Sequence, residues 1–253
     1  YTITHPKDTT LQIGNDKDIT EYRYRGANPK NYVTFNNEVW RILGVFPTDD
    51  GTGKIENRIK IVRNESVGKK YWDTSGSNSW ARSSSLNLEL NGTYYNSLDS
   101  ISKSMIENTK YYLGGYKTDE IQKDIMYQYE RKISGSGTYY YSSNPNSWVG
   151  KIALMYASDY EYAASNECTL PLYGYDNTTC KTNNWLFNND YQWLLPQFAK
   201  SSDNVFIVYS NGRIFAGIVS YNQYGVRPVL YLKSNVKITG GSGTSSNPYT
   251  LGI

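Results

Sequence analysis

The residues from Trp193 to Leu232 read WLLPQFAKSSDNVFIVYSNGRIFAGIVSYNQYGVRPVLYL. Two short apolar runs in this stretch, Val205–Tyr209 and Arg213–Val219, flank the tripeptide Ser210-Asn211-Gly212. An Asn-Gly pair between two such runs indicates a hairpin with a two-residue type I′ turn, because that turn requires positive φ at both central positions. A hairpin of this kind pairs Val208 with Phe215 and Ser210 with Arg213.

The end of the same stretch, Gly225–Leu232 (GVRPVLYL), is an apolar run that predicts a buried strand. Pro228 has no backbone N–H to donate to a neighbouring strand, and proline is therefore confined to edge strands, strand starts and bulges. We expect the strand to lie at an edge or to begin at this residue.

The residues between the two apolar parts are polar and aromatic. From Ser201 to Gly225, Tyr, Ser, Gly and Asn supply 13 of 25 residues. Binding loops use this mixture, because Tyr gives rigid contact area while Ser, Gly and Asn give adaptable hydrogen bonds. Composition by itself favours an ordinary hairpin with a polar loop, so a binding surface needs a second argument.

The first part of the chain indicates four strands, at Glu21–Arg25, Tyr32–Phe35, Glu38–Phe46 and Ile55–Val62. Asn36-Asn37 separates the second strand from the third, and Asn tolerates the left-handed conformation that a tight turn requires. Both faces of Glu38–Phe46 are largely apolar, which predicts a central strand with Ile55–Val62 as its neighbour.

The middle of the chain predicts helices. We expect Ser83–Leu98 to be partly helical with a break at Asn91-Gly92, Leu98–Ile106 to form a short helix, and Lys117–Lys132 to form the clearest helix, capped by Thr118. An apolar strand is predicted at Trp148–Tyr156, a short helix from Ser158, and two strands around a Gly/Ser turn within Lys237–Leu251. This order of elements indicates an α+β fold, with residues 1–20 as an N-terminal linker or extension and residues 21–253 as a single domain.

Composition excludes several classes of protein. The chain holds 26 Tyr and 6 Trp, which together supply the apolar area of a globular core. The net charge is +3 without a long basic run, whereas nucleic-acid binding normally shows a basic patch. No apolar run is long enough to span a membrane. Because the chain begins with Tyr1 and not Met, we expect an upstream segment, and contact with a membrane only through a segment absent from this chain.

Candidate catalytic and metal-ligating residues are few. The single histidine, His5, precedes Pro6 near the N-terminus and is interpreted as a tail residue, so no Ser-His-Asp or Cys-His set can be built around it. Cys168 and Cys180 are separated by eleven residues, which is not a zinc spacing. They form either a disulfide or two reduced thiols.

Several blocks of the chain together resemble a known fold. They are NNEVWRILGVF (Asn36–Phe46), IVRNES (Ile61–Ser66), LNGTYYNSL (Leu90–Leu98), GKIALMYASDY (Gly150–Tyr160) and Gly225–Leu251. In this order they resemble the C-type-lectin-like fold in its formylglycine-generating-enzyme branch, and within it bacterial surface proteins of unassigned function. The chain is also similar to the variable proteins of diversity-generating retroelements, in which residues before a closing strand of this kind form a diversified ligand-binding surface.

The resemblance implies a C-type-lectin-like domain with paired terminal strands, short helices and a long loop-rich half. It favours a Cys168–Cys180 disulfide and therefore an extracellular or cell-surface location. Formylglycine-generating enzymes work through a reactive cysteine pair and a metal, and this chain has only these two cysteines, so we expect no enzymatic activity and no cofactor. The loops nearest to calcium-binding motifs, Asn144-Pro145-Asn146 and Asn188-Asn189-Asp190, lack key residues, so no metal site is expected either.

By position, the resemblance places the ligand surface on the hairpin and the segment after it. The expected ligand-binding residues are Ile207, Tyr209, Arg213, Phe215, Ser220, Tyr221, Asn222 and Tyr224. Phe206, Val208 and Val219 are assigned to packing. The Asn211-Gly212 turn and Ser220–Tyr224 are expected to be exposed and close together. The implied function is an adhesin-like domain for a protein or glycan ligand, and the alternative is a structural or pilus-associated surface subunit without a dedicated ligand site.

Overall fold

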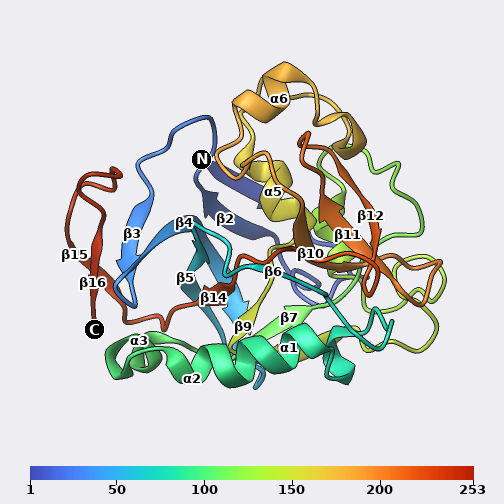
Figure 1. The fold of residues 1–253 in the computed structure, drawn as a ribbon, viewed down its shortest axis with the longest axis horizontal. Helices are drawn as coiled ribbons and strands as arrows, with labels where there is room; N and C mark the ends of the chain where they lie inside the picture. The colour runs from blue at the N-terminus through green and yellow to red at the C-terminus, as the bar shows by residue number, and fades with distance from the viewer.

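A computed structural model describes all of residues 1–253. Strands account for 35% of the residues and helices for 17%, so sheets form the scaffold and the helices cover them, as expected of an α+β protein. Strands and helices are labelled in Figure 1.

The main sheet has seven strands, in the order β1-β2-β4-β5-β14-β9, with β3 also paired to β4. Every neighbouring pair in it is antiparallel. The strands are β1 (Thr2–His5), β2 (Ile19–Arg23), β3 (Tyr32–Phe35), β4 (Glu38–Asp49), β5 (Ile55–Arg63), β9 (Ile152–Ala153) and β14 (Val229–Tyr231).

The centre of this sheet follows the prediction. Asn36 and Asn37 join β3 to β4 with φ values of 56° and 55°, which confirms the left-handed turn. β4 pairs with β2, β3 and β5, which confirms its central position, and the consecutive buried residues Trp40–Gly44 show that both of its faces are covered there.

A second sheet of five strands lies beside the main sheet, in the order β12-β11-β10-β13-β6 (Figure 1). Its strands are β6 (Lys69–Lys70), β10 (Gln192–Gln197), β11 (Asn204–Val208), β12 (Ile214–Ile218) and β13 (Tyr224–Gly225). Gly225 is the last residue of β13, and Pro228 immediately precedes β14 in the main sheet. The GVRP tetrapeptide therefore crosses from one sheet to the other, which confirms a strand start at the proline.

Two further strand pairs complete the fold, β7 (Thr109–Tyr112) with β8 (Ser147–Gly150) and β15 (Lys237–Gly240) with β16 (Thr250–Gly252). The two terminal strands do not pair with each other. β1 pairs with β2, and β16 pairs with β15 while the adjoining Tyr249 bridges to Val33 of β3. The expectation of paired terminal strands is therefore wrong, because each end has a partner nearer in sequence.

The helices are short. A nearly continuous run along the lower edge of Figure 1 comprises η1 (Trp80–Arg82), α1 (Ser85–Glu89), η2 (Leu90–Tyr94), α2 (Tyr95–Ser97) and α3 (Ser100–Met105). Asn91-Gly92 does not break this run. The Asn91 side chain accepts a hydrogen bond from the Ile152 backbone N–H at 3.0 Å and donates one to the Ile152 carbonyl at 2.8 Å. It thereby bonds the backbone of the edge strand β9, as a neighbouring strand would.

The helix predicted at Lys117–Lys132 is reduced to α4 (Met126–Glu130). Asp124 has a φ of 63°, which ends any helix before it, and its backbone N–H donates to the buried Glu161 carboxylate. Glu161 belongs to α5 (Ala157–Ala163), which begins next to the predicted start at Ser158. A tertiary contact therefore overrides the local helical pattern.

Residues 1–20 belong to the fold and are not a linker. β1 pairs with β2, and Leu11 and Ile13 are buried. His5 is 7% exposed, stacks on Tyr127 with ring centroids 3.4 Å apart, and bonds Glu21, so the interpretation as a tail residue is wrong. One cluster of 52 buried residues runs from Ile13 to Val236.

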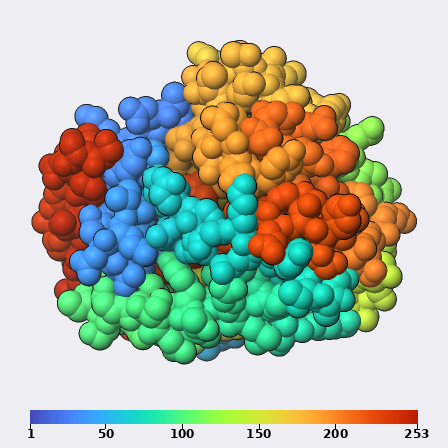
Figure 2. Space-filling view, in the orientation of Figure 1, coloured from blue at the N-terminus to red at the C-terminus, as the bar shows by residue number.

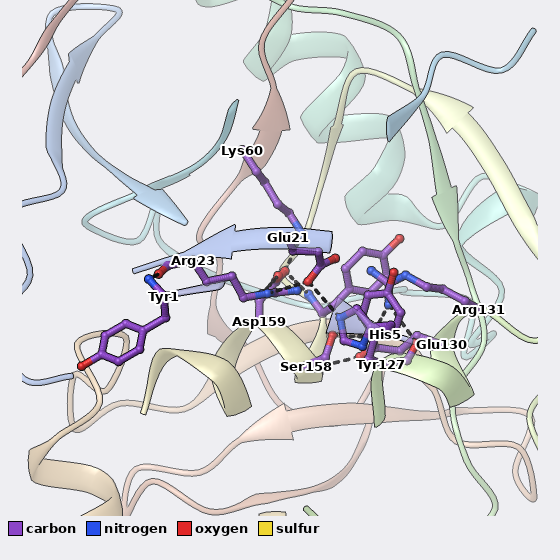
Figure 3. A network of polar contacts seen from close by, with 11 residues as sticks. Tyr1, His5, Glu21, Arg23, Lys60, Tyr127, Glu130, Arg131, Ser158 and Asp159 are labelled. Carbon is purple, nitrogen blue, oxygen red and sulfur yellow. Dashed lines mark hydrogen bonds and ion pairs between the residues drawn. The ribbon is translucent and has the colours of Figure 1, made fainter. Parts of the chain in front are cut away.

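A network of buried charges sits inside this core (Figure 3). The Asp159 carboxylate on α5 forms ion pairs with Arg23 of β2 at 3.0 Å and with Lys60 of β5 at 2.5 Å. Arg23 forms a second ion pair with Glu21 at 2.8 Å. Burial lowers the pKa of Lys60 to about 8, although the negative charge of Asp159 acts in the other direction and raises it. Each charge in this part of the network has an opposite charge beside it, which is what makes its burial tolerable.

Candidate functional site

The hairpin of β11 and β12 has a three-residue loop. The Tyr209 N–H donates to Arg213 O at 2.9 Å and the Gly212 N–H to Tyr209 O at 2.8 Å, and of Asn211 and Gly212 only the glycine has positive φ, at 101°. This is the hydrogen bonding of a turn followed by a glycine bulge, not a type I′ turn. Val208 consequently lies opposite Ile214 and Ile207 opposite Phe215, one residue away from the predicted register.

Burial corrects one predicted ligand residue on this hairpin. Ile207 is fully buried, so it cannot contact a ligand. Its side chain fills the space above Gly217, where an added Cβ would lie 3.0 Å from Ile207 Cδ1. The assignment of Phe206, Val208 and Val219 to packing is confirmed, because all three are fully buried. β11 is covered on both faces, and alternation alone does not reveal that.

Four half-buried aromatic side chains form a row across the second sheet. Tyr191 precedes β10, Tyr209 follows β11, Phe215 lies on β12 and Tyr224 on β13. Tyr191 stacks on Tyr224 with centroids 5.0 Å apart, Tyr209 lies 5.1 Å from Tyr191, and Phe215 lies 5.7 Å from Tyr209. We call these four residues the aromatic row.

Arg213 and Asn222 extend the aromatic row at its two ends. The Arg213 guanidinium carbon lies 5.3 Å from the Tyr209 ring centroid and 5.2 Å from that of Phe215. Asn222 donates to the Tyr224 hydroxyl at 3.0 Å. Burial, with smaller contributions from Tyr224 and Tyr191, raises the pKa of Tyr209, so its phenol stays neutral and remains able to donate.

The segment after β12 is exposed as predicted. Tyr221 is 74% exposed, Ser220 and Asn222 are also exposed, and Tyr224 is half-buried. The expected closeness to the hairpin turn is wrong for the start of this segment, because Ser220 and Tyr221 follow the far end of β12, whose five residues span roughly 17 Å. The chain then returns, and Tyr224 lies beside Tyr191 in the aromatic row.

The hairpin turn packs against the segment that carries the disulfide. Cys168 and Cys180 are bonded, with Cα atoms 4.7 Å apart. The segment also contains η3 (Leu172–Gly174) and α6 (Thr178–Thr182). A Cβ on Gly212 would lie 3.1 Å from Tyr175 O and 3.2 Å from Lys181 Cβ, so Gly212 is buried and only Asn211 is exposed.

The structure thus brings together five of the eight predicted residues: Tyr209, Arg213, Phe215, Asn222 and Tyr224. Ser220 and Tyr221 lie apart at the far end of the hairpin, and Ile207 is in the core. Tyr191 was absent from the predicted set, although it belongs to the aromatic cluster before the hairpin that also contains Trp185, Phe187 and Trp193. Tyr191 joins the row because β10, which it precedes, lies between β11 and β13 in the sheet.

The aromatic row can hold a ligand by stacking and by hydrogen bonds from neutral phenols and one guanidinium. No group of three or more His, Cys, Asp or Glu side chains is placed to hold a metal ion. None of the helices is long and apolar enough to cross a membrane. Comparison of the chain with protein-family models, with curated proteins and with solved structures finds no match.

Proposed function

We propose that this chain is an adhesin-like ligand-binding domain of a bacterial surface protein, with the aromatic row as its binding surface. The observation that carries the proposal is the convergence of Tyr191, Tyr209, Phe215 and Tyr224 from four neighbouring positions in one sheet, each half-buried and therefore held in place. Aromatic and Arg side chains with this kind of support dominate the binding energy of interfaces.

The C-type-lectin-like fold and a relation to variable proteins of diversity-generating retroelements are part of the same proposal. Support comes from the sequence blocks that carry the resemblance and from the position of Tyr224, which immediately precedes the GVRP tetrapeptide. The Cys168–Cys180 bond supports a location outside the reducing cytoplasm, since disulfides persist in oxidising compartments.

The test compares binding-surface variants with a control. We expect labelled protein to bind at least one member of a panel of arrayed glycans, collagen and fibronectin. Replacing both Tyr209 and Tyr224 by Ala should lower that affinity by at least about tenfold, because anchors of this type commonly cost 2 kcal/mol or more. Tyr22→Ala is the control, because Tyr22 is 52% exposed on β2 of the main sheet.

Two results would overturn this proposal. One is binding that the double variant retains at full strength. The other is wild-type protein that binds no member of the panel and instead assembles with itself, which would favour the structural or pilus-associated alternative.

A further inference from the structure

A cavity lies apart from the aromatic row, at the place where the GVRP tetrapeptide crosses from one sheet to the other. It has a volume of about 500 Å³, and most of its lining is polar. Three parts of the chain form its walls, namely the residues around β3 and the start of β4, the end of β5 with the residues after it, and the segment from Lys181 to Asn188. These parts meet near the middle of the face in Figure 2, in blue, cyan and orange. We call this cavity the inter-sheet cleft.

Two arginines line the inter-sheet cleft, Arg41 of β4 and Arg227 of the GVRP crossing. They are only 5% and 4% exposed. Neither forms an ion pair with a carboxylate within 4 Å, which is the feature that distinguishes them.

The other buried cations of the protein are all paired. Arg23 bonds Glu21 and Asp159, Lys60 bonds Asp159, Arg131 bonds Glu130, and Arg58 bonds Glu56. Of the six buried Lys and Arg side chains, the two without a carboxylate are the two in the inter-sheet cleft. An uncompensated buried charge is costly, so its retention at one place on the molecule indicates an anion that comes from outside.

The Arg41 side chain is held with one edge unused. Its guanidinium carbon lies over the ring of Tyr32, 3.7 Å from the centroid, and over the ring of Trp185, 4.7 Å from the centroid. Its Nε donates to Asn31 Oδ1 at 2.7 Å, while Nη2 is buried without any hydrogen-bond partner. The ring contacts and the Nε bond fix the plane of the guanidinium, and Nη2 remains available for an acceptor.

Arg227 is held by neutral acceptors only. Its Nε donates to Arg63 O at 2.9 Å, and its Nη1 to Leu186 O at 3.2 Å and to Gln192 Oε1 at 3.3 Å. Burial lowers the pKa of Arg41 to about 10, and burial together with the charge of Arg41 lowers the pKa of Arg227 to about 10. Each guanidinium is still charged at neutral pH, and the two positive charges repel each other.

The remaining lining gives the class of ligand. Lys181 and Glu65 also line the inter-sheet cleft. Their opposite charges cancel, so the two arginines give the cleft a net charge of two positive units. The amides of Asn28, Asn64 and Asn188 stand among the aromatic rings of Trp185 and Phe187. Amides both donate and accept, which suits hydroxyl groups, and a mostly polar wall offers little to the apolar side chain of a peptide.

We propose that the inter-sheet cleft binds the carboxylate of an acidic sugar, with Arg41 and Arg227 as its anion-binding residues. The guanidinium edge matches a carboxylate in shape as well as in charge. This site does not depend on the aromatic row, and the experiment below separates the two.

The probe is glucuronate, and the neutral comparison is glucose with sodium chloride at the same ionic strength. We expect glucuronate to raise the Tm of the wild-type protein in a concentration-dependent way, and glucose with salt to leave it unchanged. The double variant with Tyr209→Ala and Tyr224→Ala should keep this response to glucuronate. The result is therefore independent of whether the aromatic row binds a ligand.

Arg41→Met tests the residue role. Removing an unpaired buried charge should leave the Tm of the free protein unchanged or raise it, and should abolish the response to glucuronate. The matched control is Arg23→Met, which is equally buried but paired and should lower the Tm strongly, because it leaves buried Glu21 without its guanidinium partner and Asp159 with Lys60 alone. If Arg41→Met does not fold, Lys181→Ala should weaken glucuronate binding by about threefold.

Several results would count against the proposal. An unchanged response in Arg41→Met, or in Lys181→Ala where that variant has to be used, removes the assignment of the site. Equal shifts with inorganic phosphate and glucuronate overturn the choice of a sugar acid in favour of a general anion site. If a short peptide with a free C-terminus shifts the Tm and glucuronate does not, the ligand is a peptide carboxylate and the choice of a sugar acid is wrong.

Discussion

Single residues of this protein show how burial changes acid–base behaviour. Glu161 is 1% exposed, its Oε2 has no hydrogen-bond partner, and burial raises its pKa to about 8. Its other oxygen accepts the Asp124 N–H, the contact that prevents the helix predicted at Lys117–Lys132. One buried acid therefore shapes both the local fold and the pH dependence of stability.

We predict that Glu161→Gln makes the free energy of unfolding fall less steeply as the pH rises. Between about pH 4.5 and 8 the folded protein keeps the Glu161 proton and the unfolded chain has lost it, so this group lowers the free energy of unfolding by about 1.4 kcal/mol per pH unit. Glutamine has no such proton, so the variant should be the more stable protein at pH 8. Urea unfolding at pH 5, 6, 7 and 8 measures the slope.

The control for this experiment is Glu120→Gln, because Glu120 is exposed. It should show the wild-type slope. An identical slope in Glu161→Gln and in the wild-type protein would contradict the burial argument.

At the scale of elements, the disulfide segment joins the two candidate sites. Its helix α6 contains Cys180 together with Lys181 and Thr182, which line the inter-sheet cleft. Its other side contacts the hairpin turn through Gly212. The bond therefore fixes a wall of the inter-sheet cleft and the support of the aromatic row at once.

We predict that replacing Cys168 and Cys180 by Ser lowers the free energy of unfolding by about 3 kcal/mol, the chain-entropy value for a loop of this size. Urea unfolding with and without reductant measures the change. The reductant should destabilise the wild-type protein and leave the double variant unaffected. Intact mass after alkylation checks the bond itself, and two freely alkylated thiols in the native, unreduced protein would contradict it.

At the scale of the whole molecule, the core is continuous, and its buried Lys and Arg side chains are paired with carboxylates except in the inter-sheet cleft. The GVRP crossing creates that location, because Arg227 stands where the chain leaves one sheet for the other. Ligand binding at such a junction would couple both sheets to the ligand.

We predict that folding does not require a metal ion. The expectation comes from the sequence, which lacks a cluster of metal ligands, and its test is the Tm before and after adding EDTA. A bound ion stabilises the folded state by mass action, so a large fall in Tm with EDTA would prove this prediction wrong.

Local features of this fold could be predicted from the sequence because they depend on neighbours in the chain. The Asn36-Asn37 turn, the central position of β4, its pairing with β5, and the strand start at Pro228 all follow from backbone preferences and apolar runs. Three residues of the aromatic row, Tyr209, Phe215 and Tyr224, were expected at a ligand surface from composition and from the resemblance, and their role in binding stays a prediction.

Tertiary structure alone decided the features that depend on distant partners. The bulge at Gly212 arises where the turn packs on the disulfide segment, and it shifts the register by one residue. Ile207 is buried because β11 is covered on both faces, and the helix at Lys117–Lys132 is lost to Glu161. Arg41 and Arg227 are 186 positions apart in the chain (227 − 41), so no local pattern could reveal two unpaired charges in one cavity.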